Sequence, residues 1–257
     1  MKNKLIFPLC MLLFAALLAA CGSDDNESKA SSGGNGVLKM GTSADFPPYE
    51  SRNPQGEFEG FDIELAKIIA KELDMELEIQ DMKFEGLIGS LQADRVDMVI
   101  SGMNASEDRK KNVDFSKVYN DTGQMFVTKD KPMESLDELE GKTLGVQLGS
   151  IQEEGADALA KEYHFEVKKV DDAGILAQEL NANRIDVVYL SKEVALGFID
   201  SQGFSGFDDP NAPSSGMAIA FPKGSDLVDD VNNILEKLEE NGTLASLKEE
   251  WIPNSIK

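Results

Sequence analysis

From Val37 onward, short apolar runs alternate with segments in which apolar residues recur at helical spacing. In the segment 61–73, apolar residues fall at i, i+4, i+7, i+8 and i+12, and Asp62 is placed to cap the start of this predicted helix. The predicted strands are 37–41, 77–79, 96–100, 144–146, 165–170 and 185–190, and the predicted helices are 61–73, 87–91, 153–163, 175–180, 227–238 and 244–251. Strands and helices that alternate in this way predict an α/β fold.

The second half of this pattern repeats the order of the first. Leu87-x3-Leu91-x3-Arg95-Val96-Asp97 is echoed by Leu176-x3-Leu180-x3-Arg184-Ile185-Asp186. Two similar lobes explain the repeat, and Asp97 and Asp186 are then expected to serve the lobe architecture rather than a ligand. The apolar segments 125–128 and 217–221 are candidate crossovers, and two such strands would allow hinge closure over a cleft. We predict that lobe 1 comprises 37–126 and 219–257, and that lobe 2 comprises 127–218.

The first 20 residues have the pattern of a targeting segment. Lys2 and Lys4 precede an apolar run over 5–18 that is too short for a stable membrane span. The following Leu-Ala-Ala-Cys21 resembles the bacterial lipobox, in which the cysteine is diacylated and becomes the mature N-terminus. An ordinary secretory signal with a chance cysteine is the alternative. We predict a lipoprotein signal peptide over 1–20, a lipid on Cys21 that binds the membrane, and a flexible Gly- and Ser-rich tether over 21–36.

Composition excludes several kinds of chemistry. The formal net charge is −22, and loss of Lys2 and Lys4 with the signal makes it −22 − 2 = −24, which argues against nucleic acid as a partner. Cys10 would leave with the signal and Cys21 would carry lipid, so neither a disulfide nor a cysteine metal site is expected. The single histidine, His164, is a poor basis for a triad or a zinc site. We therefore predict no metal, no cofactor and no catalytic residue.

The segment 97–116, DMVISGMNASEDRKKNVDFS, has the character of a small-anion receptor. An apolar strand breaks at Ser101-Gly102, where small residues let a ligand approach the backbone closely. The segment then delivers Arg109 on a polar turn, and a guanidinium matches a carboxylate bidentately. The alternative is that Arg109 only pairs with Glu107 or Asp108 on the surface.

From Val37 to its end, the chain resembles the extracytoplasmic amino-acid-binding proteins of ABC importers, and looks most like their arginine-binding branch. The motifs that carry the resemblance are GTSADFPPYE (41–50), GFDIELAK (60–67), SGMNASEDRKKNVDFS (101–116), GKTLGVQLGSIQEE (141–154) and LEENGTLASLKEEWI (238–252). The resemblance implies a type II periplasmic-binding-protein-like fold, in which two α/β lobes joined by two crossing strands close on a ligand. It also implies a monomer that delivers an amino acid to an importer permease.

The resemblance assigns roles to individual residues in both lobes. Arg109 would bind the α-carboxylate of the ligand, and Phe46 and Phe84 would sandwich its side chain. Further contacts in lobe 1 would come from Ser101, Met103 and Asn104. In lobe 2, backbone amides at a helix start would bind the same carboxylate; they belong to Ser150, Ile151 and Gln152.

One position departs from the family pattern. Many members carry an aspartate for the α-amino group of the ligand where this chain has Ser191. A serine can accept a hydrogen bond but cannot neutralise an ammonium group. The amine must therefore find its charge elsewhere, meet carbonyl groups, or be absent from the ligand; Glu193 lies two residues further along.

The substrate class is predicted from three acids near the two aromatic residues, Asp45, Glu50 and Glu85. Carboxylates in a cleft favour a cationic side chain and repel an acidic one, so we expect a basic amino acid, arginine or a lysine-like one. Alternatively these acids belong to the overall acidic surface and the ligand is neutral, as glutamine is. Two other functions stay open: a secreted enzyme of the cyclohexadienyl dehydratase kind on the same fold, and a sensor that contacts a membrane receptor.

Overall fold

The computed structural model describes residues 36–212 and 215–252, which belong to one compact unit spanning Gly34–Lys257. The predicted signal peptide, Cys21 and the tether up to residue 35 lie outside the described residues. No helix within 36–212 and 215–252 has both the length and the apolar composition needed to cross a membrane.

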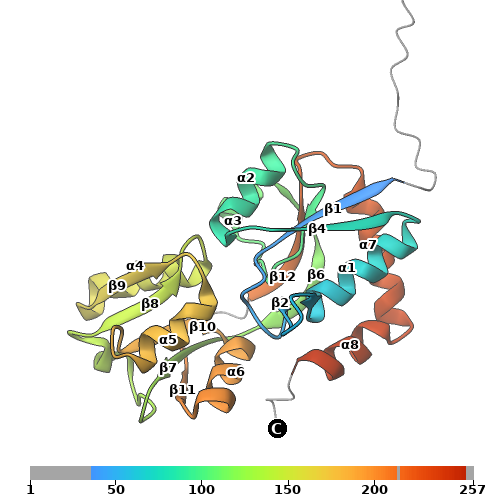
Figure 1. Ribbon diagram of the computed structural model, residues 1–257. Helices are drawn as coiled ribbons and strands as arrows, with labels where there is room; N and C mark the ends of the chain where they lie inside the picture. The colour runs from blue at the N-terminus through green and yellow to red at the C-terminus, as the bar shows by residue number, and fades with distance from the viewer. Residues whose placement is uncertain (1–35, 213–214, 253–257) are drawn as a thin grey trace, which may run out of the picture. The chain divides into compact units, whose positions relative to one another are not determined.

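The described chain builds two five-stranded sheets, each accompanied by its own helices (Figure 1). The first sheet and its helices, here called lobe 1, contain β1 (Val37–Thr42), α1 (Phe61–Glu72), β4 (Glu76–Asp81), α2 (Leu87–Gln92), β5 (Met98–Val99), α3 (Glu107–Lys110), β6 (Asp114–Thr122), β12 (Ser215–Phe221), α7 (Leu227–Glu240) and α8 (Thr243–Trp251). The second, lobe 2, contains β7 (Gln124–Thr128), β8 (Thr143–Gln147), α4 (Ile151–Tyr163), β9 (Glu166–Val170), α5 (Leu176–Asn181), β10 (Val187–Ser191), α6 (Lys192–Gln202) and β11 (Ser205–Asp208). The predicted α/β architecture is confirmed.

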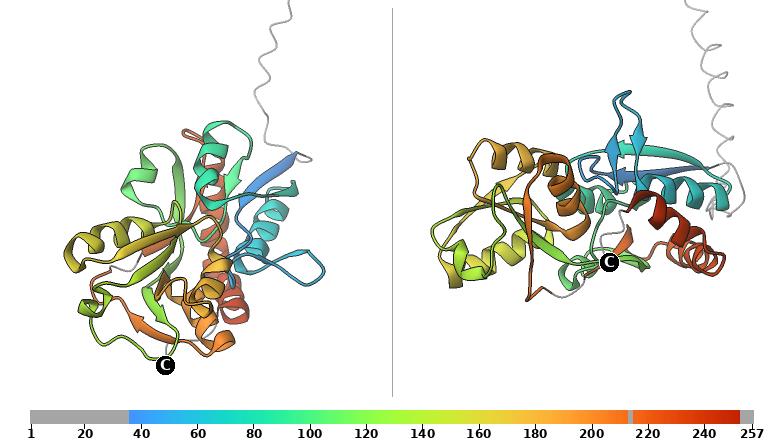
Figure 2. Two further views of the ribbon diagram at one scale, coloured as in Figure 1. Left: turned by 60° about the vertical axis from the view of Figure 1, so that its left-hand side comes forward. Right: turned by 90° about the horizontal axis from the view of Figure 1, so that it is seen from below.

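Smaller elements complete both lobes. A hairpin of β2 (Ser51–Arg52) and β3 (Phe58–Glu59) projects from lobe 1, as the right-hand view of Figure 2 shows. Short 3-10 turns precede helices or strands at η1 (Phe84–Gly86), η2 (Leu136–Leu139) and η3 (Ala173–Ile175). Two of them, η1 and η3, stand at matching places, each between a strand and the second helix of its lobe.

The two sheets share one plan. Their strand orders are β4-β1-β5-β12-β6 and β9-β8-β10-β7-β11. In each, the first three strands are parallel, and the fourth runs antiparallel to the third and to the edge strand. The sequence repeat therefore corresponds to a repeated fold, with β1-α1-β4-α2-β5 matching β8-α4-β9-α5-β10.

The repeated aspartates have the same structural task in both lobes. The Oδ2 atom of Asp97 accepts a hydrogen bond from the N–H of Lys39 at 2.8 Å, and Oδ2 of Asp186 accepts one from the N–H of Thr143 at 2.9 Å. Each lies just before a central parallel strand and holds the start of the neighbouring strand. Their expected role in lobe architecture is therefore confirmed.

The chain passes between the sheets slightly earlier than the sequence predicted. All of β7 pairs in the second sheet and all of β12 pairs in the first, whereas the predicted boundaries after residues 126 and 218 fall inside these strands. The change of sheet instead comes at Gly123 and between Asp208 and Ser215. The apolar segments called crossovers are thus the first strands after each crossing.

Burial explains the strength of the main sequence signals. Every residue of β10 is buried because this strand lies in the middle of the second sheet. In α7, the buried residues Val231, Ile234, Leu235 and Leu238 follow helical spacing, so only one face packs on the protein. Strand β6 was not predicted, because it is an edge strand with register shifts against β12 and an exposed Val118 that breaks its alternation.

Helix α1 begins differently from the prediction. Its N-cap is Gly60, with no side-chain cap, and Asp62 lies within the first turn. The φ and ψ angles of Gly60 are 126° and 172°, a region that only glycine adopts readily, and a Cβ there would lie 2.3 Å from the carbonyl oxygen of Tyr49. Asp62 is therefore not a helix cap, and its carboxylate instead accepts the N–H of Gly102.

We expect Gly60→Ala to lower the free energy of unfolding by about 3 kcal/mol or more, since it adds backbone strain and a clash with the main chain. Urea unfolding followed by circular dichroism measures this loss. The control is Gly56→Ala, where φ is 83° but nothing lies within 4 Å of the added Cβ; its loss should be about 1 kcal/mol. Equal losses in the two variants would contradict the steric argument.

Candidate functional site

The site residues predicted from the sequence lie at or just beyond the carboxyl ends of the parallel strands. Those of lobe 1 follow β1, β4 and β5, and those of lobe 2 follow β8 or end β10. Open α/β sheets bind ligands at these strand ends, because the loops there leave a crevice between sheet and helices. Hydrogen bonds between the two lobes, given below, show that the two sets of loops face each other.

Arg109 lies at this junction and contacts both lobes. It is on the short helix α3, where the hydroxyl of Ser106 caps its N–H at 3.3 Å. Its Nη1 donates to the carbonyl of Asn104 and its Nη2 to the carbonyl of Gly149 in lobe 2, both at 2.8 Å. These bonds occupy only part of the donor set of a guanidinium, which has five N–H groups.

Arg109 forms no ion pair in the described chain, and the charge of Glu154 acts on it only from beyond ion-pair distance. The side chain is buried, and no acid forms an ion pair with it within 36–212 and 215–252. Glu107 and Asp108 pair with Lys110 and Lys111 instead, so the surface alternative for Arg109 is contradicted. Burial lowers the pKa of Arg109 to about 10, which still leaves it charged at neutral pH. Such a group is suited to bind an anion that arrives from outside.

The two predicted aromatic residues flank the same region from lobe 1. The guanidinium carbon of Arg109 lies 5.3 Å from the ring centroid of Phe84, a cation–π distance. Phe46 stacks on Tyr49 with 6.0 Å between centroids, and its ring would lie 3.1 Å from a Cβ at Gly102. Both rings are almost fully buried. That they hold a ligand side chain stays a prediction.

The loop Ser101 to Asn104 is held from below by buried carboxyl groups. Ser101 donates its hydroxyl to Glu50 Oε1 at 2.8 Å and accepts the N–H of Ser43 at 3.0 Å. Its hydroxyl is thus committed within the lobe, and a ligand contact from Ser101 would come from its backbone. Met103 is buried, and its carbonyl accepts the N–H of Ala218 at 2.9 Å. The carbonyl of Asn104 is the one that holds Arg109.

Glu50 and Asp62 form a fully buried pair beneath that loop. Asp62 Oδ2 accepts the N–H of Gly102 at 2.7 Å and the hydroxyl of Tyr119 at 2.9 Å. Burial raises the pKa of both acids, that of Asp62 to about 6, and Asp62 raises that of Glu50 further. A proton on Glu50, shared toward Asp62, satisfies the oxygens that have no other partner in the described chain. The expectation that Glu50 is a cleft carboxylate for a cationic ligand is therefore wrong, because its side chain is fully buried and burial raises its pKa.

Helix α4 of lobe 2 presents its N-terminus to the junction. Ser150 is the N-cap: its hydroxyl accepts the N–H of Glu153 at 3.1 Å and donates to the carbonyl of Gln147 at 2.7 Å. The N–H groups of Ile151 and Gln152 precede the first intrahelical bond, so they are available to an anion. The predicted amide of Ser150 is not, because it donates to the carbonyl of Gln147 at 3.3 Å. The adjacent carbonyl of Gly149 is the one that binds Arg109, which brings the helix start and the guanidinium together.

The side chain of Gln152 extends toward the end of β10. Its Nε2 lies 3.3 Å from the hydroxyl of Ser191 and also donates to Gln124. Ser191 is buried at the start of α6, and two residues later Glu193 is buried as well. Glu193 accepts hydrogen bonds from the hydroxyls of Thr122 and, at 3.1 Å, of Tyr49 in lobe 1.

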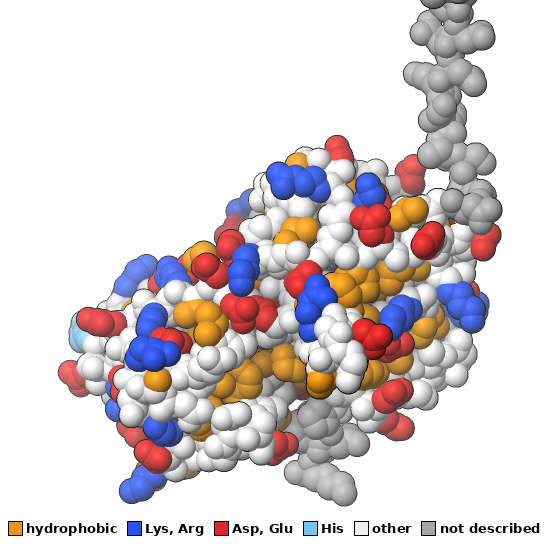
Figure 3. All heavy atoms as spheres, in the orientation of Figure 1, with side chains coloured by type: hydrophobic (Ala, Val, Ile, Leu, Met, Phe, Trp, Pro, Cys, Tyr) orange, Lys and Arg blue, Asp and Glu red, His pale blue; other side chains and the backbone are white. Residues whose placement is uncertain are grey.

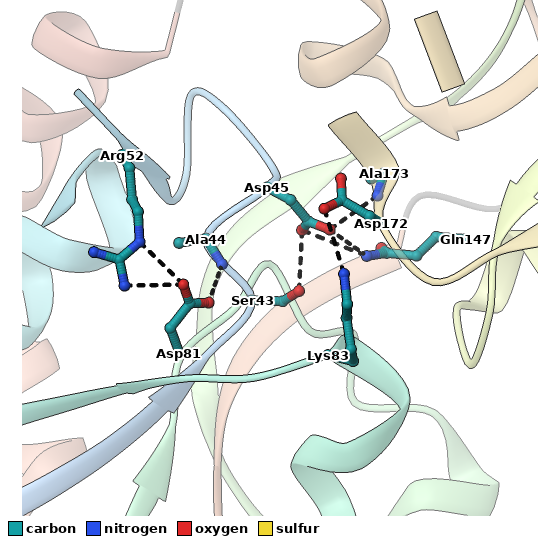
Figure 4. A network of polar contacts seen from close by, with 9 residues as sticks. All are labelled: Ser43, Ala44, Asp45, Arg52, Asp81, Lys83, Gln147, Asp172 and Ala173. Carbon is teal, nitrogen blue, oxygen red and sulfur yellow. Dashed lines mark hydrogen bonds and ion pairs between the residues drawn. The ribbon is translucent and has the colours of Figure 1, made fainter. Parts of the chain in front are cut away.

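Asp45 bridges the two lobes at the other side of the junction (Figure 4). Its carboxylate accepts the N–H of Ala173 at 2.9 Å and the Nε2 of Gln147 at 3.2 Å, both in lobe 2, and the hydroxyl of Ser43 at 3.0 Å. Beside it, Lys83 and Asp172 form a second cross-lobe contact at 3.4 Å. We call the bonds of Asp45 to Ala173 and Gln147 the Asp45 latch. Asp45 thus holds the lobes together, whereas the predicted Glu85 is exposed and packs its backbone near Gly149.

Cross-lobe contacts were the main features that sequence reasoning missed. Gln147 and Tyr49 lie inside the quoted motifs, but nothing in the sequence pairs them with Asp45 and Glu193, which are 102 and 144 residues away. The sequence marks Glu193 only by its position two residues after Ser191. Within the described residues, no group of three or more His, Cys, Asp or Glu side chains is arranged to hold a metal ion.

Comparison with known proteins agrees with this geometry. Residues 38–254 match the family described as bacterial extracellular solute-binding proteins, family 3. The arginine-binding extracellular protein ArtP of Bacillus subtilis (strain 168) is 44% identical over 255 residues, which cover 97% of each chain.

Solved structures give the same result. An ancestral arginine-binding protein bound to arginine has a TM-score of 0.80 at 38% identity, over 85% of this chain and 99% of that one. The ancestral amino-acid-binding protein AncCDT-1, described as a precursor of cyclohexadienyl dehydratase, has a TM-score of 0.79 at 30% identity, over 85% and 96%. The predicted fold class is thereby confirmed.

The Asp45 latch predicts a pH dependence of stability. Burial raises the pKa of Asp45 from 3.8 to about 6, and nearby Asp172 adds to the effect. The latched form therefore holds the proton of Asp45 more tightly than the unfolded chain does. The contribution of Asp45 to the unfolding free energy falls as the pH rises from about 4 to about 6, and it is lowest above that range.

We expect the unfolding free energy of the wild type, relative to Asp45→Asn, to fall by about 1–2 kcal/mol between pH 4 and pH 7; partial solvent access keeps this below the full two-unit value. Urea titrations at a series of pH values measure the difference. Asp200→Asn, an exposed acid on α6, is the matched charge control. A difference between wild type and Asp45→Asn that stays constant with pH would contradict the burial of a charged latch.

Proposed function

This chain belongs to family 3 of the bacterial extracellular solute-binding proteins, and on that premise we propose that it captures a basic amino acid, arginine first. We further propose that it is a monomer that delivers the ligand to the permease of an ABC importer. Binding, rather than catalysis, is its task. The observation that carries the proposal is Arg109, a buried guanidinium at the lobe junction that forms no ion pair in the described chain.

In this proposal, the ligand is bound between the two lobes by groups from both. The α-carboxylate of the ligand would take the remaining N–H groups of Arg109 from lobe 1 and the N–H groups at the start of α4 from lobe 2. Because one ligand group would bond to both lobes, binding would favour the closed arrangement. The cross-lobe bond from Arg109 to Gly149 and the Asp45 latch support such closure. A permease could then recognise the closed form.

The choice of a basic ligand rests on likeness and on charge. The arginine-binding relatives support arginine, and the rings of Phe46 and Phe84 are of the kind on which a guanidinium stacks, as that of Arg109 does on Phe84. Of the three acids that favoured a cation, Asp45 and Glu85 keep this role in the proposal, and Glu50 does not. Charged side chains of both signs are interspersed on the face in Figure 3, so the net charge alone does not choose the ligand.

The membrane anchor is proposed from the sequence alone. The lipobox-like Leu-Ala-Ala-Cys21 supports a lipid on Cys21, and the polar segment that follows supports a tether between that lipid and the folded unit. An anchored receptor would hold captured ligand close to its importer. This position suits delivery better than it suits a freely secreted enzyme.

A thermal-shift screen of the protein against all amino acids tests the ligand class. A basic amino acid at about 100 times its dissociation constant should add roughly 2.7 kcal/mol of stability. Arg109→Ala should weaken that binding by about 2–5 kcal/mol, because it removes one partner of a buried charge pair. The exposed Arg95→Ala is the control and should bind as the wild type does.

Each alternative has its own outcome in this screen. A shift with glutamine but not with arginine or lysine would replace the basic ligand by a neutral one. Absence of any shift would contradict amino acid binding. Wild-type affinity in Arg109→Ala would contradict the role proposed for Arg109. Turnover of prephenate or arogenate would favour the dehydratase alternative.

Lipidation is tested by metabolic labelling with a fatty acid in a bacterial host. We expect label in the wild type and in Cys10→Ser, because Cys10 lies within the predicted signal peptide, and none in Cys21→Ser. A wild type without label would favour an ordinary secretory signal, and label that persists in Cys21→Ser would show that the lipid is not on Cys21.

A further inference from the structure

Four charged side chains are buried among the residues that the structure describes, Glu50, Asp62, Arg109 and Glu193. Glu50 and Asp62 lie together, and a shared proton satisfies them. Arg109 and Glu193 remain. They carry opposite charges, yet they form no ion pair with each other or with any other residue in 36–212 and 215–252.

Glu193 has hydrogen-bond donors but no positive charge beside it. Its carboxylate accepts from the hydroxyls of Tyr49 and Thr122, both of which are neutral donors. The neighbouring Lys192 is engaged with Asp208 at 3.0 Å. A buried carboxylate without a cation is costly, because hydroxyl donors replace only part of the hydration that it loses. Such a cost is expected where a ligand provides the missing charge.

Glu193 reaches the lobe junction from the lobe opposite Arg109. It lies in the first turn of α6, directly after β10, and its bond to Tyr49 crosses to lobe 1. Tyr49 in turn stacks on Phe46, one of the two aromatic residues assigned to the ligand. The end of β10 also connects to the helix start beside Arg109, because Ser191 contacts Gln152.

The other acids near the junction are poorly placed for this task. Asp45 accepts three hydrogen bonds in and around its latch, and Glu85 is exposed. Ser191, at the end of β10, carries no charge. Glu193 is thus the buried acid of lobe 2 in the described chain that can meet a positive charge from the ligand.

We propose that Glu193 is the counter-charge for the α-ammonium group of the ligand. Arg109 and Glu193 then recognise the two charges of a zwitterion from opposite lobes, and the ligand provides the ion pairs that the protein lacks. This inference rests on the proposed function, since it requires that the ligand is an amino acid. It answers the question raised by Ser191, because a carboxylate two residues further along carries the charge that serine cannot.

The test compares two ligands and two variants by isothermal titration calorimetry. The ligands are L-arginine, or the amino acid that the screen identifies, and its des-amino analogue, for arginine 5-guanidinopentanoate. In the wild type, the analogue should bind at least tenfold more weakly than the amino acid. In Glu193→Gln, the affinity for the amino acid should fall at least tenfold, while that for the analogue should change less than twofold. The ratio of the two affinities, which measures the preference for the amine, should therefore fall at least fivefold. Asp200→Asn, an exposed acid on the same helix, should keep the wild-type preference.

The ratio between the two ligands separates recognition of the amine from a structural role. If Glu193→Gln lowers the affinity for both ligands by the same factor, or for neither, the inference is overturned. Amino acid binding by the wild type would then still stand. If the wild type binds no amino acid, the proposed function fails and the inference fails with it.

Two further variants keep the test decisive. Recovery of the preference in the double variant Ser191→Asp/Glu193→Gln would support recognition by charge. If Glu193→Gln does not fold, Glu193→Asp replaces it: the shorter side chain withdraws the carboxylate, so the ligand ratio should fall while the analogue binds unchanged. An unchanged ratio in Glu193→Asp would overturn the inference.

Discussion

The burial of Arg109 is the constraint on which the rest of the site depends. A guanidinium can be buried only where fixed acceptors replace water, and here the carbonyls of Asn104 and Gly149 do so from two different lobes. The loop that supplies Asn104 needs the turn at Gly102, which Asp62 holds through its N–H. Gly149 directly precedes Ser150, the N-cap of α4, so the start of that helix fixes the position of the second carbonyl. Both lobes thus hold the guanidinium of Arg109 in place without a contribution from a ligand.

The two lobes share one architecture but use it for different chemistry. Asp97 and Asp186 do the same work in each, and the parallel strands end at matching places. The lobes differ after those strand ends. Lobe 1 places a guanidinium and aromatic rings there, whereas lobe 2 places a capped helix start and a buried acid. A duplicated scaffold with dissimilar loops can therefore bind the two ends of one small asymmetric molecule.

The parts of the fold that could be predicted from the sequence are those with local causes. Helix α7 and strand β10 follow from periodicity or from a continuous apolar run, and the paired Asp97 and Asp186 follow from the repeat. The site loops were recognised through motifs. Strand β6 was missed because its edge position leaves Val118 exposed, and Glu50 was misassigned because its bond to Ser101 spans 51 residues. Burial and long-range pairing depend on tertiary structure, and no pattern within one segment encodes them.

The position of β12 has a consequence for how the chain reaches its native state. This strand lies between β5 and β6 in the first sheet. The strand β6 therefore pairs with that sheet only through β12, which lies some 90 residues further along the chain. The strands of lobe 2, by contrast, follow one another without interruption from Gln124 to Asp208. We therefore expect the second sheet to be complete while the first still lacks the strand between β5 and its edge strand β6. Lobe 1, which begins the described chain, is therefore expected to complete its folding last. Until the C-terminal segment is in place, the apolar residues of β5 and β6 stay exposed and prone to aggregation.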